Sequence, residues 1–262
     1  MKKKITLVAT SVLLVAAMVI GGTLAYFTST DYATNVMTLG NVAIKQTEEE
    51  RAYDAEGKFY TLRDFTQDQA LYPMVDNRQP GDVLTVPAVV NVAGDTETKV
   101  FNNLENAIDK FISVTNTGTQ DAYVRTILAF ETAKVYEAGT DKVIGDAHDK
   151  YFLVNGTFDY LKDDETGNFV TIKIDGTEYC LAVCVYENAI GPEERTPTSL
   201  RQIGMTWDAD NEAYSLFGNT YEILALSQAT QTTGFTDAQA ALNEAFGVVD
   251  AENAKEWFEA IS

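Results

Sequence analysis

Apolar and β-branched residues gather in short runs that recur along most of the chain, with turn-forming residues between them. Runs of this kind, spaced about 8 to 12 residues apart, are typical of strands in a β-sandwich or jelly roll. Gly40 interrupts the first run, which favours a bulge or kink, and Pro87 interrupts the second, which favours an edge strand or a break. We expect strands at 36–45, 83–92, 110–116, 122–130, 151–154, 169–174, 177–186, 214–217 and 220–228.

Two turn signals predict β-hairpins. The five residues 117–121, which include Gly118, separate the runs 110–116 and 122–130. Asp175-Gly176 separates the runs 169–174 and 177–186. A short glycine-containing loop and an Asp-Gly pair both join neighbouring antiparallel strands, so each pair of runs is expected to form a hairpin.

The helical pattern is strongest at the C-terminal end. Residues 236–247 are rich in alanine, with Thr236 placed as an N-cap and Gly247 as a stop. Residues 250–258 set Ala254, Trp257 and Phe258 on one face of a second helix. We expect these two helices, within about 236–260, to pack onto a sheet, and a partner-binding helix pair is the alternative. A short helix is also expected at 101–109.

These elements together predict a mainly β fold. We expect a jelly-roll-like antiparallel β-sandwich with two short C-terminal helices, following an N-terminal signal helix. Residues 47–76 are mixed and charged, and we expect them to form a surface insertion in that sandwich.

The first 25 residues read as a secretory signal peptide. Three lysines precede an apolar run at 5–20, and small residues follow it up to Ala25. Cleavage between Ala25 and Tyr26 satisfies the small-x-small rule and leaves a domain of residues 26–262. An uncleaved membrane anchor is the alternative, although the apolar run is shorter than the roughly 20 residues that span a bilayer. The protein is therefore expected to be secreted, in an extracellular matrix or on the cell surface, and to meet the membrane only through this peptide.

The net charge argues against nucleic acid as a partner. The formal charge is −20, and it becomes −23 when the three lysines of the signal peptide are removed. A charge of this size repels phosphate polymers, favours solubility and attracts cationic partners.

Cys180 and Cys184 are the only cysteines, and they lie in one predicted strand. Four strand residues separate their Cα atoms by about 13 Å, whereas a disulfide tolerates less than about 7 Å. We therefore expect two core thiols on one face of that strand, with a disulfide between chains as the alternative.

Motifs for catalysis are absent from the sequence, and we expect no enzyme and no cofactor. His148 is the only histidine, so multi-histidine metal centres are excluded. Its polar setting predicts a solvated loop, and no nucleophile motif accompanies it.

Calcium is the one metal that the sequence leaves open. Acidic residues cluster at 48–50, at 163–165 and at Asp208, Asp210 and Glu212. The last group alternates carboxylates as a calcium loop does, but it lacks the glycine and the distant glutamate of an EF-hand, so a hairpin turn is the favoured interpretation. The 13 tyrosines also leave open an exposed aromatic face for sugar binding or self-assembly, whose members the sequence does not identify.

Several segments resemble proteins that the SipW-type signal peptidase processes, a group that includes the TasA/camelysin family of biofilm-matrix and surface proteins. The residues that carry this resemblance are Gly22-Thr23-Leu24-Ala25-Tyr26-Phe27-Thr28-Ser29-Thr30-Asp31, Leu39-Gly40-Asn41-Val42, Gln79-Pro80-Gly81-Asp82, Val114-Thr115-Asn116-Thr117-Gly118, Ala122-Tyr123-Val124-Arg125 and Leu226-Ser227-Gln228-Ala229-Thr230-Gln231.

The resemblance implies a SipW-type signal peptidase as a partner during export, and a mature N-terminal segment that adds as a strand to a neighbouring subunit. An extended segment can hydrogen-bond to an open sheet edge while alternate side chains enter the neighbour's core. The candidate donor residues are Val36, Met37, Leu39, Val42 and Ile44. The expected function is that of a secreted structural protein of the biofilm matrix or cell surface, which self-assembles into fibres. The alternative is a monomeric surface adhesin, or a glycan- or calcium-binding module.

Overall fold

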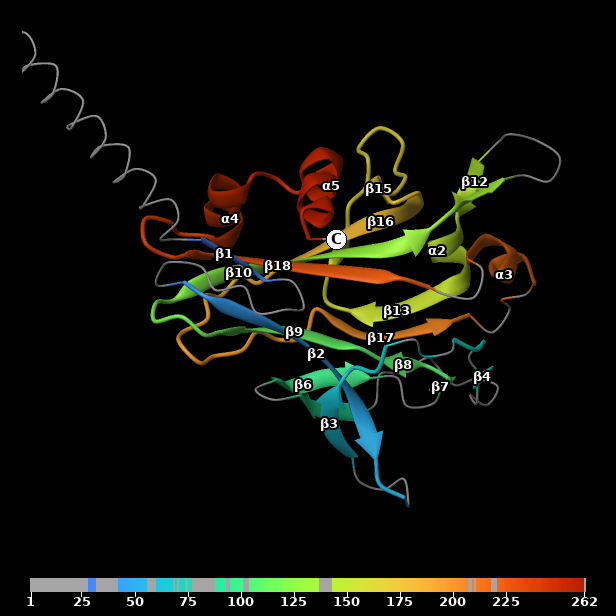
Figure 1. The fold of residues 1–262 in the computed structure, drawn as a ribbon, viewed down its shortest axis with the longest axis horizontal. Coiled ribbons are helices and arrows are strands. Elements are labelled where there is room, and N and C mark those ends of the chain that lie inside the picture. Colours follow the sequence, from blue (N-terminus) through green and yellow to red (C-terminus); the bar gives the residue numbers. More distant parts are fainter. Residues whose placement is uncertain are drawn as a thin grey trace, which may run out of the picture.

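The fold is mainly β, with antiparallel sheets and four helices in the part of the chain that is described (Figure 1). The computed structural model describes residues 28–31, 42–55, 60–67, 69, 71–73, 75–76, 88–92, 95–100, 104–136, 143–206, 209, 211–217 and 221–261. None of the helices among these residues has the length and apolar composition needed to cross a membrane.

The largest sheet has six strands, in the order β1-β18-β10-β16-β14, with β15 also paired to β16. These strands are β1 (Thr28–Asp31), β10 (Ala122–Thr132), β14 (Asp159–Tyr160), β15 (Thr171–Ile174), β16 (Thr177–Val185) and β18 (Ile223–Gln231). We call it the central sheet because other elements cover both of its faces.

Smaller sheets and four helices complete the structure. Two sheets have three strands: β3 (Tyr60–Asp64), β2 (Ile44–Tyr53) and β9 (Phe111–Asn116) form one, and β13 (Phe152–Gly156), β17 (Leu200–Met205) and β8 (Ile108–Asp109) form the other. The two-stranded pairs are β11 (Lys134–Tyr136) with β12 (Val143–Asp146), β4 (Val75–Asp76) with β7 (Leu104–Glu105), and β5 (Ala88–Val92) with β6 (Asp95–Val100). The helices are α2 (Ala147–Tyr151), α3 (Asn211–Phe217), α4 (Ala238–Phe246) and α5 (Ala251–Glu259).

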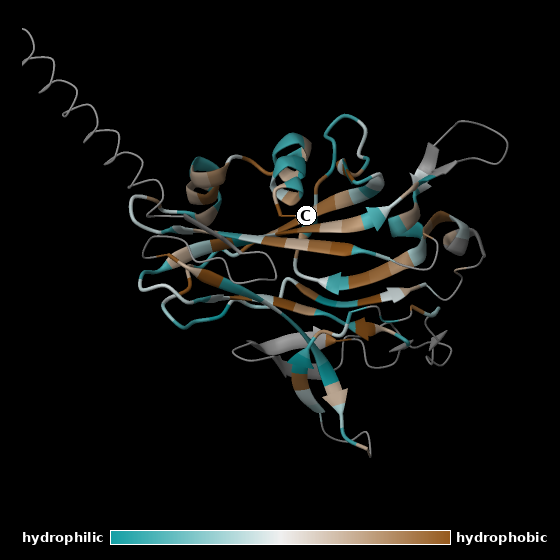
Figure 2. Cartoon of the chain, in the orientation of Figure 1, coloured by the Kyte–Doolittle hydropathy of each residue, from teal (hydrophilic) through white to brown (hydrophobic). Residues whose placement is uncertain are grey.

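The central sheet is apolar on both faces, because successive side chains of a strand point to opposite sides. On one face, Ile127 and Leu181 pack against Ala254 and Phe258 of α5. On the other face, the apolar side chains of β10, β16 and β18 pack against β9 and β17 of the smaller sheets. Figure 2 shows apolar residues along these strands and more polar ones on the outer sides of the helices. The prediction that the two C-terminal helices pack onto a sheet is confirmed.

Aspartate side chains cap the two C-terminal helices. Asp237 accepts a hydrogen bond from the backbone nitrogen of Ala240, and Asp250 accepts one from Asn253. The expected cap at Thr236 is therefore wrong by one residue, because the carboxylate of Asp237 takes this role. Gly247 ends α4 with a φ of 91°, a conformation that glycine adopts without strain.

One predicted hairpin is confirmed and the other is wrong. β15 and β16 pair across Asp175-Gly176, whose φ angles of 47° and 94° suit a two-residue turn. In contrast, β9 pairs with β2, while β10 pairs with β16 and β18. The loop at 117–121 thus carries the chain from one sheet to another. The far edge of β9 is instead occupied by the segment that holds Thr196, whose backbone nitrogen donates to Val114 over 2.8 Å.

Three further expectations need correction or placement. The strand expected at 214–217 belongs to α3, and the short helix expected at 101–109 is replaced by β7 and β8 within its described residues. Residues 47–76, expected as an insertion, include most of β2, which pairs with β9, and also β3 and β4. Cys180 and Cys184 are buried and free, as expected of core thiols.

Candidate assembly site at the N-terminal edge strand

β1 forms one edge of the central sheet. It runs antiparallel to β18, with Thr28 opposite Thr230 and Asp31 opposite Ser227. The other side of β18 is taken by β10 over nine residue pairs, so β18 is an interior strand. Within the described residues, β1 pairs with β18 alone. The N-terminal region therefore already contributes a strand to its own sheet.

This strand was not anticipated. The apolar pattern predicts the first strand at 36–45, whereas β1 lies at Thr28–Asp31, soon after the expected cleavage site between Ala25 and Tyr26. That cleavage site and residues 32–41 lie outside the described residues. The signal for β1 was weak but present, because threonine favours strands and Thr28 and Thr30 alternate with serine.

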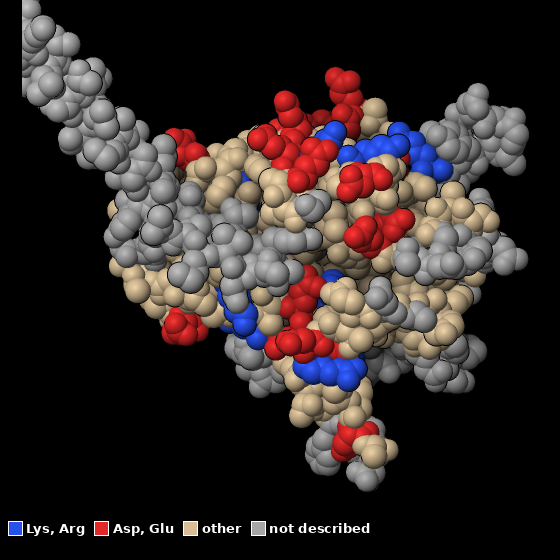
Figure 3. Space-filling model, in the orientation of Figure 1, with Lys and Arg blue, Asp and Glu red and all other residues tan. Residues whose placement is uncertain are grey.

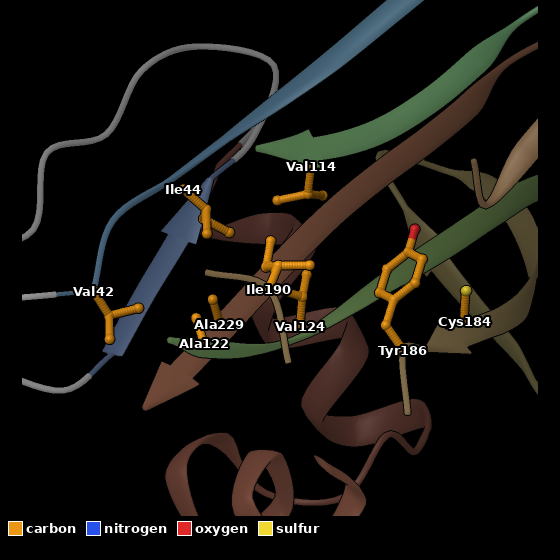
Figure 4. Close-up of a cluster of buried hydrophobic side chains, with 9 residues drawn as sticks. All are labelled: Val42, Ile44, Val114, Ala122, Val124, Cys184, Tyr186, Ile190 and Ala229. Atoms are coloured by element: carbon orange, nitrogen blue, oxygen red, sulfur yellow. The ribbon is translucent and has the colours of Figure 1, made fainter. Parts of the chain in front are cut away.

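Two of the five donor candidates are buried in the core of their own chain. Val42 and Ile44 lie in one apolar cluster with residues from β9, β10 and β18. Figure 4 shows them beside the other side chains of this cluster, which are Val114, Ala122, Val124, Cys184, Tyr186, Ile190 and Ala229. The remaining candidates Val36, Met37 and Leu39 lie outside the described residues.

Backbone hydrogen bonds fix the chain between these two core residues. The carbonyl oxygen of Ala43 accepts from the backbone nitrogens of Thr117 and Gly118, over 2.8 and 3.0 Å. From Ile44 onward β2 pairs with β9, beginning with Ile44 opposite Asn116. Val42 and Ile44 thus belong to the fixed body of the domain.

A buried hydrogen-bonded layer joins β18 to β10 and β2. Ser227, the partner of Asp31 in the strand register, donates to Oε1 of Gln46 over 2.7 Å. The Ser227 hydroxyl also lies 3.0 Å from that of Thr126 on β10. All three side chains are buried. A satisfied polar layer of this kind fixes the registers of β2, β10 and β18, because a shift of one of these strands leaves the members without partners.

The acidic clusters do not assemble a metal site among the described residues. Asp208 and Asp210 lie outside the described residues, and so does the side chain of Glu212, whose backbone belongs to α3. The hairpin turn favoured for this segment is wrong from residue 211 onward, where the helix begins. Across the described ranges, no group of three or more His, Cys, Asp or Glu side chains is placed to hold a metal ion.

The glutamates of the 48–50 cluster are engaged in ion pairs. Glu48 pairs with Lys110, and Glu49 pairs with Arg195. Glu50 is buried and pairs with Arg63, and it also accepts a hydrogen bond from Thr66. Burial alone would raise the pKa of Glu50, but the hydrogen bonds from Thr66, Arg63 and Gln69 together lower it. These carboxylates therefore act as structural contacts between β2 and its surroundings.

His148 is buried, so its expected place in a solvated loop is wrong. Its Nδ1 lies 2.6 Å from the hydroxyl of Tyr221, and its Nε2 lies 2.7 Å from the hydroxyl of Tyr160. The ring also stacks on Phe130, with 4.9 Å between ring centroids. Burial lowers the pKa of His148 to about 4, so the imidazole is neutral at pH 7. Both ring nitrogens are thus committed to the core.

The surface carries many acidic side chains, including a group over α5 and the loop before β15 (Figure 3).

Compared with protein-family models, with curated proteins and with solved structures, the chain gives no significant match.

Proposed function

We propose that the chain is a secreted structural protein of a biofilm matrix or cell surface, with a jelly-roll-like domain that assembles by donating its N-terminal strand to a neighbouring copy. The observation that carries the proposal is the position of β1. This short strand follows the expected cleavage site, forms the edge of the central sheet and pairs with β18 alone among the described strands. Cleavage by a SipW-type signal peptidase would give it a free end.

The energetic cost of exchanging this strand between copies is small. β1 has four residues, and each backbone hydrogen bond contributes only about 0.5–1.5 kcal/mol net. Opening β1 therefore costs a few kcal/mol, and a neighbour's β1 restores the same contacts in the same register. An exchange of identical strands is close to neutral in contact energy, so protein concentration decides its extent.

The chain also has enough length for the exchange. Ten residues, 32–41, separate β1 from Val42 in the sequence. A fully extended segment of that length spans at most about 33–36 Å, which is about twice the radius of gyration of a domain of this size. Donation from each copy to the next is a head-to-tail contact, which produces an open fibre unless the rotation closes it into a ring.

The first test removes β1 without disturbing the core. Protein beginning at Tyr26 is compared with a version beginning at Tyr32, which lacks β1 but keeps Val42 and Ile44. Electron microscopy and light scattering should show fibres for the longer protein only, while circular dichroism should show folded protein for both. Monomers from both versions at millimolar concentration would contradict the proposal.

The second test identifies the partner of β1. Ser29 and Ala229 lie opposite each other, so Ser29→Cys combined with Ala229→Cys places two thiols within reach of a disulfide. Oxidised fibres should give a ladder of linked chains on a non-reducing gel, because the two cysteines belong to different copies. Oxidised monomer should give a single band. A single band from intact fibres would mean that β1 stays in its own chain and that another surface assembles the fibre.

A further inference from the structure

Tyr53 is one of three large apolar or aromatic side chains that are clearly exposed in the described part of the chain, with 53% of its surface accessible. It lies near the end of β2, directly opposite Tyr60 of β3. Figure 1 shows that this pair of strands projects away from the rest of the domain. The two rings meet edge to face, with 6.0 Å between their centroids. The end of this hairpin thus presents the ring of Tyr53 to solvent, while Tyr60, which also packs against Val100 and Phe111, supports that ring from the side.

The side chain of Arg51 packs against the ring of Tyr53 and restricts its position. The guanidinium carbon of Arg51 lies 5.4 Å from the centroid of the Tyr53 ring and 5.9 Å from that of Tyr60. Arg51 makes a two-point contact with Asp109, in which Nη2 donates to Oδ1 over 2.8 Å. Asp109 also accepts from Gln202 of β17 over 2.9 Å. A continuous chain of contacts therefore fixes the aromatic pair to the body of the domain, although it lies at the surface.

This arrangement reduces the cost of binding. Tyrosine offers a large and rigid contact area with little side-chain entropy to lose. Because Arg51 and Tyr60 already restrict the ring, a ligand that stacks on Tyr53 does not need to order it.

The charges around the aromatic pair limit the class of ligand. The side chains of Arg51 and Asp109 are only 11% and 10% exposed and neutralise each other. Burial alone would lower the pKa of Arg51, but the hydrogen bonds and the charge of Asp109 outweigh it and raise that pKa. Arg63 is paired with Glu50, so each of the two arginines in the described part of the hairpin already forms an ion pair. Since the whole chain carries a formal charge of −20, a polyanion is disfavoured here.

The size of the patch favours a small ligand over a protein. A fully covered aromatic side chain buries about 150–250 Å², and Tyr53 is already half covered. A stable protein interface needs about 800 Å² from each partner. The exposed part of Tyr53 supplies a small part of that area, but it matches the apolar face of one sugar ring.

We propose that Tyr53, supported by Tyr60 and Arg51, is a binding platform for the pyranose rings of a glycan that carries no negative charge. The axial C–H groups of a pyranose carry partial positive charge and stack on the electron-rich face of an aromatic ring. This site is separate from β1 and does not depend on assembly.

The test uses hexamers of β-1,4-linked N-acetylglucosamine and of β-1,4-linked glucose as neutral probes, with hexagalacturonate as the anionic probe. The protein begins at Tyr26 and is used at a concentration at which light scattering shows no assembly, so that assembly does not affect the result. Calorimetric titration and saturation-transfer NMR should detect binding of at least one neutral hexamer. Tyr53→Ala should weaken it by about tenfold, the effect of losing one aromatic contact, and Tyr53→Phe should retain it.

Tyr72→Ala is the matched control, because Tyr72 is 61% exposed and lies outside the β2–β3 hairpin. This variant should bind as tightly as the parent protein. The proposal is overturned if neither neutral hexamer binds at millimolar concentration, if Tyr53→Ala binds unchanged, or if Tyr72→Ala weakens binding equally. Tighter binding of hexagalacturonate than of both neutral probes would also overturn it. Circular dichroism of each variant checks that the fold is retained.

Discussion

Nη2 of Arg125 donates a hydrogen bond to the carbonyl oxygen of Gly247 over 2.9 Å, which joins the middle of the central sheet to the end of α4. The same guanidinium donates to Gln228 over 2.8 Å and to Asn243 over 3.0 Å. It also lies 5.1 Å from the ring of Trp257 in α5. The side chain is completely buried. One arginine of β10 therefore connects a neighbouring strand with both C-terminal helices.

Replacing this arginine by lysine should loosen the C-terminal helices. Burial lowers the pKa of Arg125 to about 10, so it still carries its charge at pH 7. Arg125→Lys keeps the charge but loses the planar fork that reaches three acceptors. We expect the free energy of unfolding to fall by about 2–4 kcal/mol. Urea unfolding measures this fall, and hydrogen exchange should show earlier opening of α4 than of β10. Lys255→Ala, in an exposed pair with Glu259, should change stability by less than about 0.5 kcal/mol.

Substitution of Asn116 should lower the free energy of unfolding as much as substitution of Arg125, for a different reason. Its Nδ2 donates to the carbonyl oxygens of Gln120 and Ile190 over 2.8 and 2.9 Å, and its Oδ1 accepts from Gly118. Asn116→Asp replaces both donors by an acceptor that faces two carbonyl oxygens, in a fully buried position. We expect a loss of about 2–4 kcal/mol in the free energy of unfolding at pH 7.

The loss at Asn116→Asp should shrink as the pH falls, because a buried and repelled carboxyl has a raised pKa and donates again once it is protonated. Denaturant melts at pH 7 and pH 5 measure the difference. Asn168→Asp, at an exposed position, is the control and should stay close to the parent at both pH values. An equal loss in the two variants would assign the effect to added charge instead of the lost donor.

The sequence predicts the elements that depend on local pattern. β10, β16 and β18, the β15–β16 turn and the two C-terminal helices all lie near their expected residues. Each has a signal within its own run, such as alternating apolar residues, an Asp-Gly pair, or an alanine-rich stretch that ends in glycine. Such signals do not require knowledge of which distant segment lies alongside.

The errors arise where distant segments decide the outcome. The loop at 117–121 has the composition of a hairpin turn, but β9 finds its partners in β2 and in the segment around Thr196, 82 residues from Val114. His148 lies among polar neighbours in the sequence, yet Tyr221, 73 residues away, supplies a hydrogen bond that allows its burial. The sequence also does not show which of the 13 tyrosines are exposed, because the exposure of Tyr53 depends on how far the β2–β3 hairpin projects from the domain.

Buried His148 should make the domain sensitive to mild acid. Its folded-state pKa is about 4, below the ordinary value of 6.5. A histidine with a lowered pKa contributes its stability above pH 6.5, and that contribution is lost as the pH falls toward 4. Between pH 6.5 and pH 5 the loss is about 2 kcal/mol. Because His148 is the only histidine, its imidazole NMR signals need no assignment, and they should stay at the neutral position down to pH 5. Titration of the folded protein near pH 6.5 would contradict its burial.

His148→Gln provides the control for this acid effect. Glutamine keeps one donor and one acceptor for Tyr160 and Tyr221, but it does not titrate. The variant should therefore be less stable than the parent at pH 7 and should show a flatter dependence of stability on pH between 6.5 and 5. An unchanged slope would place the acid sensitivity on other groups.

Glu131 should have the opposite effect on the pH dependence of stability, because its ionisation lowers the free energy of unfolding as the pH rises. Burial raises its pKa, the hydrogen bond from the backbone of Glu222 lowers it, and the charge of Glu222 raises it again, with a net increase. The ionised carboxylate is therefore less favourable in the folded chain than in the unfolded one. Glu131→Gln removes that charge, and its amide oxygen still accepts from the backbone nitrogen of Glu222, a bond of 2.8 Å in the parent. We expect a gain of a few tenths to about 1 kcal/mol at pH 7.

The sign of this gain follows from the raised pKa. A carboxyl with a raised folded-state pKa costs stability once it ionises, so the advantage of Glu131→Gln should be present at pH 7 and should vanish below the ordinary value of 4.5. Glu165→Gln removes the same charge at an exposed position and should leave stability nearly unchanged. If both variants gain equally in urea melts, the gain comes from the lower net charge of a strongly acidic chain, and the local repulsion between Glu131 and Glu222 is not its cause.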